Sequence, residues 1–85
     1  MFTTVWSDAN GTFSLNANSG VNVFNEGYTA LPTTPVGYTR ITWWVRISGN
    51  SGVIPCGVET GWIQNTTNSN ASGLFAQAVG LYYKG

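Results

Sequence analysis

Few residues in this 85-residue chain could carry out catalysis. The chain has no histidine and one cysteine, so it can supply neither a Ser–His or Cys–His nucleophile pair nor the ligands of a zinc site. Glu26 and Glu59 could form the acid pair of a glycosidase, although any two acids in any protein meet that criterion. Cys56 stands among apolar residues, which predicts a buried thiol. We therefore expect no enzymatic activity, no metal site and no cofactor.

The residues best suited to binding lie on one expected strand, residues 37–48. Period-two alternation gives this strand a core face made of Ile41, Trp43, Val45 and Ile47. The opposite face then carries Tyr38, Arg40, Thr42, Trp44 and Arg46. Trp, Tyr and Arg are enriched at the energetic centres of protein interfaces, and a guanidinium can stack on an aromatic ring. This row predicts a protein interface; the alternative is a strand buried on both faces, with the arginines reaching solvent along their stems.

The aromatic residues also raise the alternative of sugar binding. Four tryptophans and four tyrosines stand on a neutral chain rich in amides. Aromatic faces can pack on sugar rings while Asn, Thr and Gln supply hydrogen bonds. Trp44, Trp62 and Tyr38 are the candidate contacts to a cell-surface glycan. The competing explanation is that most of these rings form the core of a small domain.

The scarcity of charge limits which partners the chain can have. Charged residues make up 7% of the chain, against about 25% in a typical domain, and the net charge is zero. Three basic residues are too few to neutralise several phosphates, which argues against nucleic acid. The first residues lack the basic and apolar regions of a signal peptide, and no apolar run is long enough to insert in a membrane. We expect synthesis in a cytoplasm, and a surface that favours oligomers or symmetric assemblies.

Alternation and turn signals predict an all-β fold throughout the chain. We expect one domain over residues 1–85, a small antiparallel β-sandwich or barrel of about six to seven short strands. Asn10-Gly11 predicts a hairpin turn between strands at 3–6 and 12–16. Pro55 indicates an edge position or a bulge, and the run 65–73 a polar loop. Residues 74–84 fit either helical or strand spacing, but Gly80 and the Tyr82-Tyr83 pair favour a strand.

The composition as a whole resembles a class of viral proteins. Strands rich in Thr, Asn and Gly, few charges, a single thiol and the aromatic ending Gly80-Leu81-Tyr82-Tyr83-Lys84-Gly85 are similar to those of small bacteriophage virion proteins. These include capsid decoration or cement proteins, head fibres and tail-tip modules. The resemblance implies a non-enzymatic protein on the virion surface that binds neighbouring capsid or tail subunits. It carries no diagnostic motif, so it assigns no site residue.

Overall fold

The computed structural model describes residues 1–24 and 31–85, and every regular element in these residues is a β-strand. Seven strands form two antiparallel sheets. The strands are β1 (Phe2–Asp8), β2 (Phe13–Leu15), β3 (Gly20–Asn22), β4 (Thr39–Ser48), β5 (Val53–Pro55), β6 (Trp62–Asn65) and β7 (Ala71–Tyr83). The all-β prediction is confirmed, and the two sheets do not close into a barrel.

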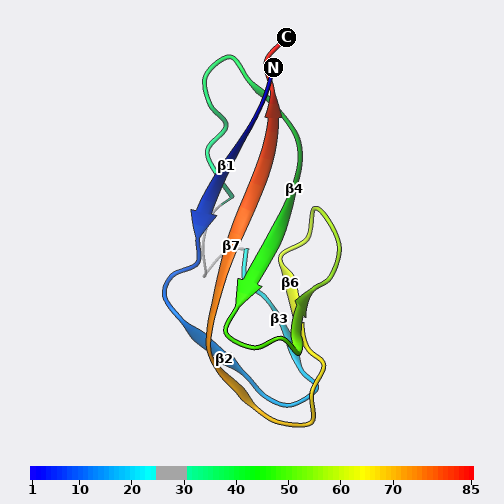
Figure 1. Ribbon diagram of the computed structural model, residues 1–85. Helices are drawn as coiled ribbons and strands as arrows, with labels where there is room; N and C mark the ends of the chain where they lie inside the picture. The colour runs from blue at the N-terminus through cyan, green and yellow to red at the C-terminus, as the bar shows by residue number, and fades with distance from the viewer. Residues whose placement is uncertain (25–30) are drawn as a thin grey trace.

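Strand β7 is the axis of the molecule (Figure 1). A strand of 13 residues spans about 44 Å, close to the 46 Å long dimension of the molecule. Strands β1 and β2 pair in succession along one edge of β7, and β4 pairs along the other. Both chain ends meet at one end of this sheet, where the backbone N–H of Lys84 donates to the carbonyl of Met1 at 2.9 Å. The ambiguous C-terminal segment is therefore a strand, as predicted.

The expected hairpin at Asp8–Gly11 is wrong. Gly11 does adopt a positive φ of 84°, but β1 and β2 pair with β7 and not with each other. Between them the N–H of Ala9 continues the ladder by donating to the carbonyl of Ala76 at 2.9 Å. The chain thus leaves the edge of β7 for a short turn and then pairs with the same edge again as β2.

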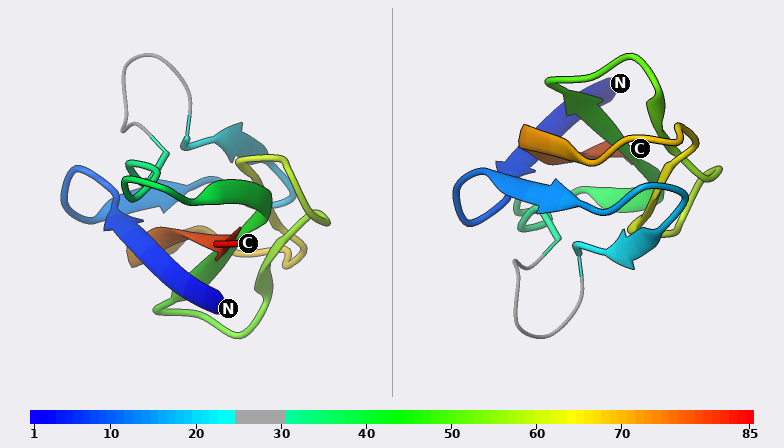
Figure 2. Two further views of the ribbon diagram at one scale, coloured as in Figure 1. Left: turned by 90° about the horizontal axis from the view of Figure 1, so that it is seen from above. Right: turned by 90° about the horizontal axis from the view of Figure 1, so that it is seen from below.

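The smaller sheet, in the order β3-β6-β5, packs against the inner face of the larger one (Figure 2). Pro55 lies in an edge strand of this sheet, as predicted. The core between the sheets is small and aliphatic, formed mainly by Leu15, Val45, Val53, Ile63, Leu74, Ala76 and Ala78. Toward the chain ends, Tyr82 is fully buried and its hydroxyl donates to the carbonyl of Pro32 at 3.1 Å, so segment 31–38 covers the inner face there.

A fully buried asparagine holds the polar loop that follows β6. The Nδ2 of Asn65 donates to the carbonyls of Leu15, Asn16 and Ser69, at 3.4, 3.2 and 2.9 Å. Its Oδ1 accepts bonds from the N–H and the hydroxyl of Thr67, at 3.0 and 2.7 Å. A polar loop is therefore present, but it covers only residues 66–70 of the predicted 65–73, because Asn65 ends β6 and β7 already begins at Ala71, which is buried and pairs with Leu15. The Asn65 side chain fixes the shape of this loop and its attachment to the end of β2.

Candidate functional site

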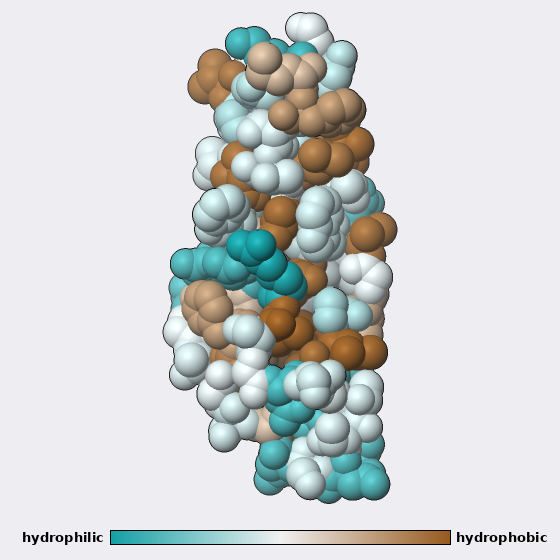
Figure 3. Space-filling view, viewed as in Figure 1, coloured by the Kyte–Doolittle hydropathy of each residue, from teal (hydrophilic) through white to brown (hydrophobic). Residues whose placement is uncertain are grey.

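The candidate site is the face of the larger sheet that points away from the core, here called the outer face. Cross-strand pairing places on it alternate residues of β1, β7 and β4: Phe2, Thr4, Trp6, Asp8, Phe75, Gln77, Val79, Leu81, Tyr83, Thr39, Thr42, Trp44, Arg46 and Ser48. The isolated bridge from Trp44 to Val58 adds Val58 at the β4 side. Figure 3, in which β1, β7 and β4 are toward the reader, shows hydrophobic surface on both sides of a hydrophilic patch near the middle.

Large apolar side chains on this face are open to solvent. Phe2 is 63% exposed, Trp6 56% and Tyr83 40%. The rings of Phe2 and Tyr83 pack against each other, with centroids 4.8 Å apart and planes tilted by 55°. Trp6 and Trp44 flank Val79, which is buried. No described segment covers this aromatic surface, so in the isolated chain water must solvate it.

A polar row crosses the same face next to the tryptophans. The Nε of Arg46 donates to the Oε1 of Gln77 at 2.5 Å, and the Nε2 of Gln77 donates to the Oδ1 of Asp8 at 2.5 Å. The Cζ of Arg46 also lies over the Trp6 ring, 5.5 Å from its centroid. Arg46 and Asp8 are the charged residues that the described pairing places on the outer face, one of each sign. The face is therefore neutral as a whole.

The structure confirms only part of the row predicted from the sequence. Thr42, Trp44 and Arg46 share the outer face, whereas Arg40 pairs with Tyr82 and so belongs to the inner side. The cause is a β-bulge: Arg40 and Thr42 pair with successive residues of β7, so Ile41 is an extra residue that reverses the alternation. The assignment of Ile41 to the core is wrong, since its side chain is 51% exposed.

Tyr38 lies at the end of the sheet, because it precedes β4, whose first residue Thr39 pairs with Tyr83 at the end of β7. Its hydroxyl donates to the sulfur of Met1 at 3.6 Å, and the Nζ of Lys84 lies 5.8 Å from the centroid of its ring. Tyr38 thus packs with the two chain ends and is separate from Trp44. Tyr38 and Arg40 do not belong to the candidate site.

Several residues of the outer face were missed by sequence reasoning, above all Phe2, Trp6, Asp8, Gln77 and Tyr83. Their period-two spacing within residues 2–8 and 75–83 was visible. What the sequence does not show is that the first and last strands are neighbours, with Trp6 opposite Val79 and Asp8 opposite Gln77. That pairing turns two separate alternating segments into one aromatic surface.

Trp62 lies on the smaller sheet and is separate from the outer face. Its ring covers Gly20, where a Cβ would come within 2.7 Å of ring carbons. Its Nε1 donates to the Oε1 of Gln64 at 3.2 Å, and the side chain is 41% exposed. The result is a fixed, half-exposed indole, here called the Trp62 platform.

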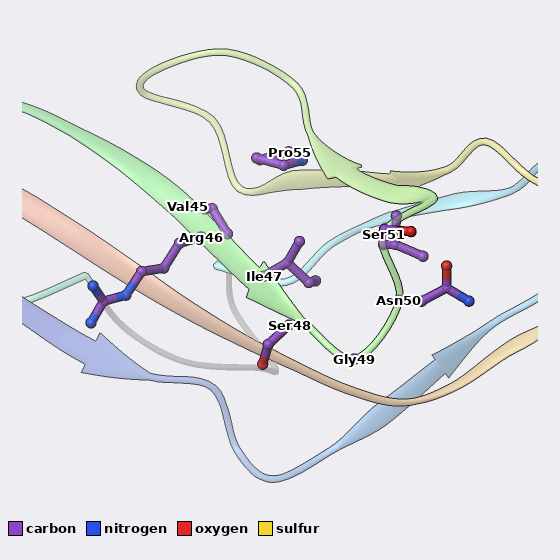
Figure 4. A pocket seen from close by; sticks show the side chains of 9 residues that line it. Val45, Arg46, Ile47, Ser48, Gly49, Asn50, Ser51 and Pro55 are labelled. Carbon is purple, nitrogen blue, oxygen red and sulfur yellow. The ribbon is translucent and has the colours of Figure 1, made fainter.

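A groove runs along residues 45–48 of β4, on the edge of the strand away from β7 and beyond the Trp44–Val58 bridge (Figure 4). It has a volume of about 490 Å³ and lies between residues 45–48 of β4 and residues 53 and 55 of β5, with the connecting turn at its end. Arg46 and Ser48 point toward the β7 side of β4 in this view. A smaller hollow of about 200 Å³ lies on the outer face itself, lined by Arg46, Ile47, Ser48, Phe75 and Gln77. The outer face therefore has a shallow hollow beside its polar row.

The remaining chemical candidates do not come together. Cys56 is exposed, so the prediction of a buried thiol is wrong; it follows the edge strand β5 and lies outside the core. Glu59 is exposed in a loop with a φ of 56°, and Glu26 lies outside the described residues. Within residues 1–24 and 31–85, no three His, Cys, Asp or Glu side chains cluster as metal ligands would. The same residues contain no helix able to span a membrane.

The outer face is thus an exposed, neutral, aromatic sheet surface with one polar row. Comparisons of the chain with protein-family models, with curated proteins and with solved structures find no match.

Proposed function

We propose that this chain is a non-enzymatic structural protein of a virus particle, and that it binds neighbouring subunits through the outer face. The observation that carries the proposal is the exposure of Phe2, Trp6 and Tyr83 together on one uncovered sheet face. Exposed aromatic side chains gathered on one face in this way favour an interaction surface.

The energetics favour a covered outer face. An aromatic side chain carries about 150–250 Å² of surface, so the exposed parts of these three rings amount to roughly 300 Å². Burying that area would contribute about 7 kcal/mol before the cost of association, at about 25 cal/mol per Å². The arginine, aspartate and glutamine of the polar row add directional bonds, which fix how a partner sits.

The virion setting is supported by composition. The scarcity of charge leaves little electrostatic repulsion between copies, which suits a protein packed at high density. Strands rich in Thr, Asn and Gly resemble those of small bacteriophage virion proteins of the decoration, fibre and tail-tip types. An elongated shape of 46 × 20 × 18 Å, with β7 along its length, offers a long flank to neighbouring subunits.

The test is incorporation into particles. Virus particles purified by density gradient from cells that produce this chain should contain it at a fixed ratio to the major shell protein. Trp6→Ala should lower that ratio several-fold, whereas Trp62→Ala, the same change on the other sheet at a similar exposure, should leave it unchanged. Recovery of the wild-type chain only outside particles would contradict the proposal.

Glycan binding is a second candidate, favoured by the Trp62 platform. A fixed indole beside Gln64 presents one flat apolar surface and an amide, the combination that receives a sugar ring. Titration with a panel of bacterial surface glycans should then quench or shift the tryptophan fluorescence of the wild type and of Trp6→Ala, but not of Trp62→Ala. No response from the wild type at millimolar glycan would contradict this second function.

A further inference from the structure

We infer that the partner of the outer face is a second copy of this chain, paired face to face about a two-fold axis parallel to β7. This inference rests on the proposed function, because it assigns the occupant of the same surface. Two-fold pairs are the commonest protein oligomers, and they require a surface that is complementary to itself. The outer face meets that requirement in its charges.

The charges of the face are balanced and are placed on different strands. Asp8 lies on β1 and Arg46 lies on β4. Gln77 of β7 lies between them in the same row. A face with net charge would repel its own copy, whereas this face carries one charge of each sign. Arg40, which pairs with Tyr82, belongs to the inner side, and Lys84 follows the paired strands with its Nζ 5.8 Å from the centroid of the Tyr38 ring.

A two-fold axis parallel to β7 leaves each cross-strand row at the same position along β7. It exchanges the β1 end and the β4 end of the row. The β4 side of one copy then faces the β1 side of the other. In the polar row, Arg46 meets Asp8 of the second copy, twice by symmetry. In the neighbouring row, Trp6 meets Trp44 of the second copy. A two-fold axis perpendicular to the strands would instead reverse the order of the rows along β7, so these pairs of residues would not face each other.

Arg46 has unused donors for this contact. Its Nε is occupied by Gln77, but its two Nη groups make no hydrogen bond with the described residues, and the side chain is exposed. A guanidinium binds a carboxylate best through two parallel N–H···O bonds, which two nitrogens of the fork can supply. Asp8 keeps its bond from Gln77 in this arrangement, and a carboxylate has about four acceptor positions to share among its partners.

The size of the face sets the expected strength of the pair. Seven residues of strand are about 24 Å long and three strands about 14 Å wide, so two paired faces would bury roughly 700 Å² in all, less than the about 1,000 Å² of a stable specific interface. Isolated chains should therefore pair weakly and exchange rapidly. The pair would become stable where other contacts hold many copies at high local concentration, as in a particle.

The experiment is complementation between two charge variants. Arg46→Asp gives the row two carboxylates, and Asp8→Arg gives it two guanidiniums. By sedimentation equilibrium, each variant alone should lose self-association at least ten-fold relative to the wild type, because its row now repels its copy. An equimolar mixture should recover pairing, with one chain of each kind in the pair, which isotope labelling of one variant will reveal. Should either variant prove unfolded by circular dichroism, Arg46→Glu and Asp8→Lys replace them.

Complementation cannot arise from contacts inside one chain, since neither variant contains both original charges. A wild type that is monomeric at millimolar concentration, or a mixture that pairs no better than its components, would overturn the inference. Either failure leaves the proposed function testable, because the effect of Trp6→Ala on particle incorporation does not depend on which protein covers the face. Loss of incorporation with monomeric wild type would mean that a different subunit is the partner.

Discussion

Arg46 and Trp6 belong to strands on opposite sides of β7, yet the Cζ of Arg46 lies 5.5 Å from the centroid of the Trp6 ring. The guanidinium reaches across the central strand and binds Gln77 on the way. One side chain thereby links all three strands of the outer face. The face is ordered before any partner arrives, which lowers the entropy cost of binding.

Arg46→Met should weaken this link while keeping most of the side-chain volume. We expect the free energy of unfolding to fall by about 0.5–1 kcal/mol, the contribution of an exposed cation–π contact. Urea titration followed by circular dichroism measures this, and acrylamide quenching should increase because Trp6 loses its cover. Arg40→Met, on the inner side of the same strand, is the control and should change stability by less than about 0.5 kcal/mol. Equal effects of the two changes would show that the Arg46–Trp6 contact adds nothing.

Asn65→Ala should be among the more destabilising single changes. The substitution removes a fully buried amide and leaves the carbonyls of Asn16 and Ser69 without that donor. An unsatisfied buried polar group costs about 1–3 kcal/mol, and we expect a loss in that range in urea unfolding. Asn68→Ala, an exposed position in the same loop that loses only one surface hydrogen bond from Asn18, is the matched control with an expected loss of about 0.5 kcal/mol. A loop unaffected by Asn65→Ala would mean that backbone turns alone set its shape.

Gly80→Ala should be costly although alanine is a small residue. A Cβ at this position would lie 2.5–2.7 Å from the hydroxyl and ring atoms of Tyr82, whose side chain is fully buried and cannot move aside freely. Overpacking of this kind costs about 1–3 kcal/mol. Thermal unfolding should show the loss, together with a changed near-ultraviolet circular dichroism signal from the displaced ring. Gly85→Ala, where the new Cβ meets Tyr83 at an ordinary 3.4 Å, should be neutral.

Cys56 should react as a surface thiol. Because its side chain is exposed, a disulfide reagent such as DTNB should modify one thiol per chain in the absence of denaturant. Cys56→Ser should leave the free energy of unfolding unchanged within about 0.5 kcal/mol. A thiol that reacts only in urea would place Cys56 in the core, as the sequence had suggested.

The sequence was informative wherever structure depends on neighbouring residues. Period-two alternation identified the strands, and the aromatic, glycine-containing ending was rightly favoured as a strand. Val45 was placed correctly in the core, because its position depends only on alternation along the part of β4 that follows the bulge. The prediction of a turn at Asn10-Gly11 was also right, because Gly11 has a positive φ. Only the hairpin pairing was wrong.

Long-range pairing was beyond the sequence, and the candidate site depends on it. The turn at Asn10-Gly11 was expected to make a hairpin, but β7 offers an edge long enough for both flanking strands. The bulge at Ile41 reversed the faces of the residues before it in β4, Thr39 and Arg40, and nothing local distinguishes Ile41 from an ordinary strand residue. Trp44 and Arg46 were therefore identified, whereas Trp6 and Asp8, which complete the surface, were not.

The central claim is that the outer face is covered when the protein acts. Hydroxyl-radical footprinting with mass spectrometry, on the isolated chain and on its assembled form, tests this directly at single side chains. Trp6 and Tyr83 should be oxidised readily in the isolated chain and protected severalfold on assembly, while Trp62 stays equally reactive in both states. Protection of Trp62 with Trp6 still open to oxidation would place the binding surface on the other sheet and contradict the account.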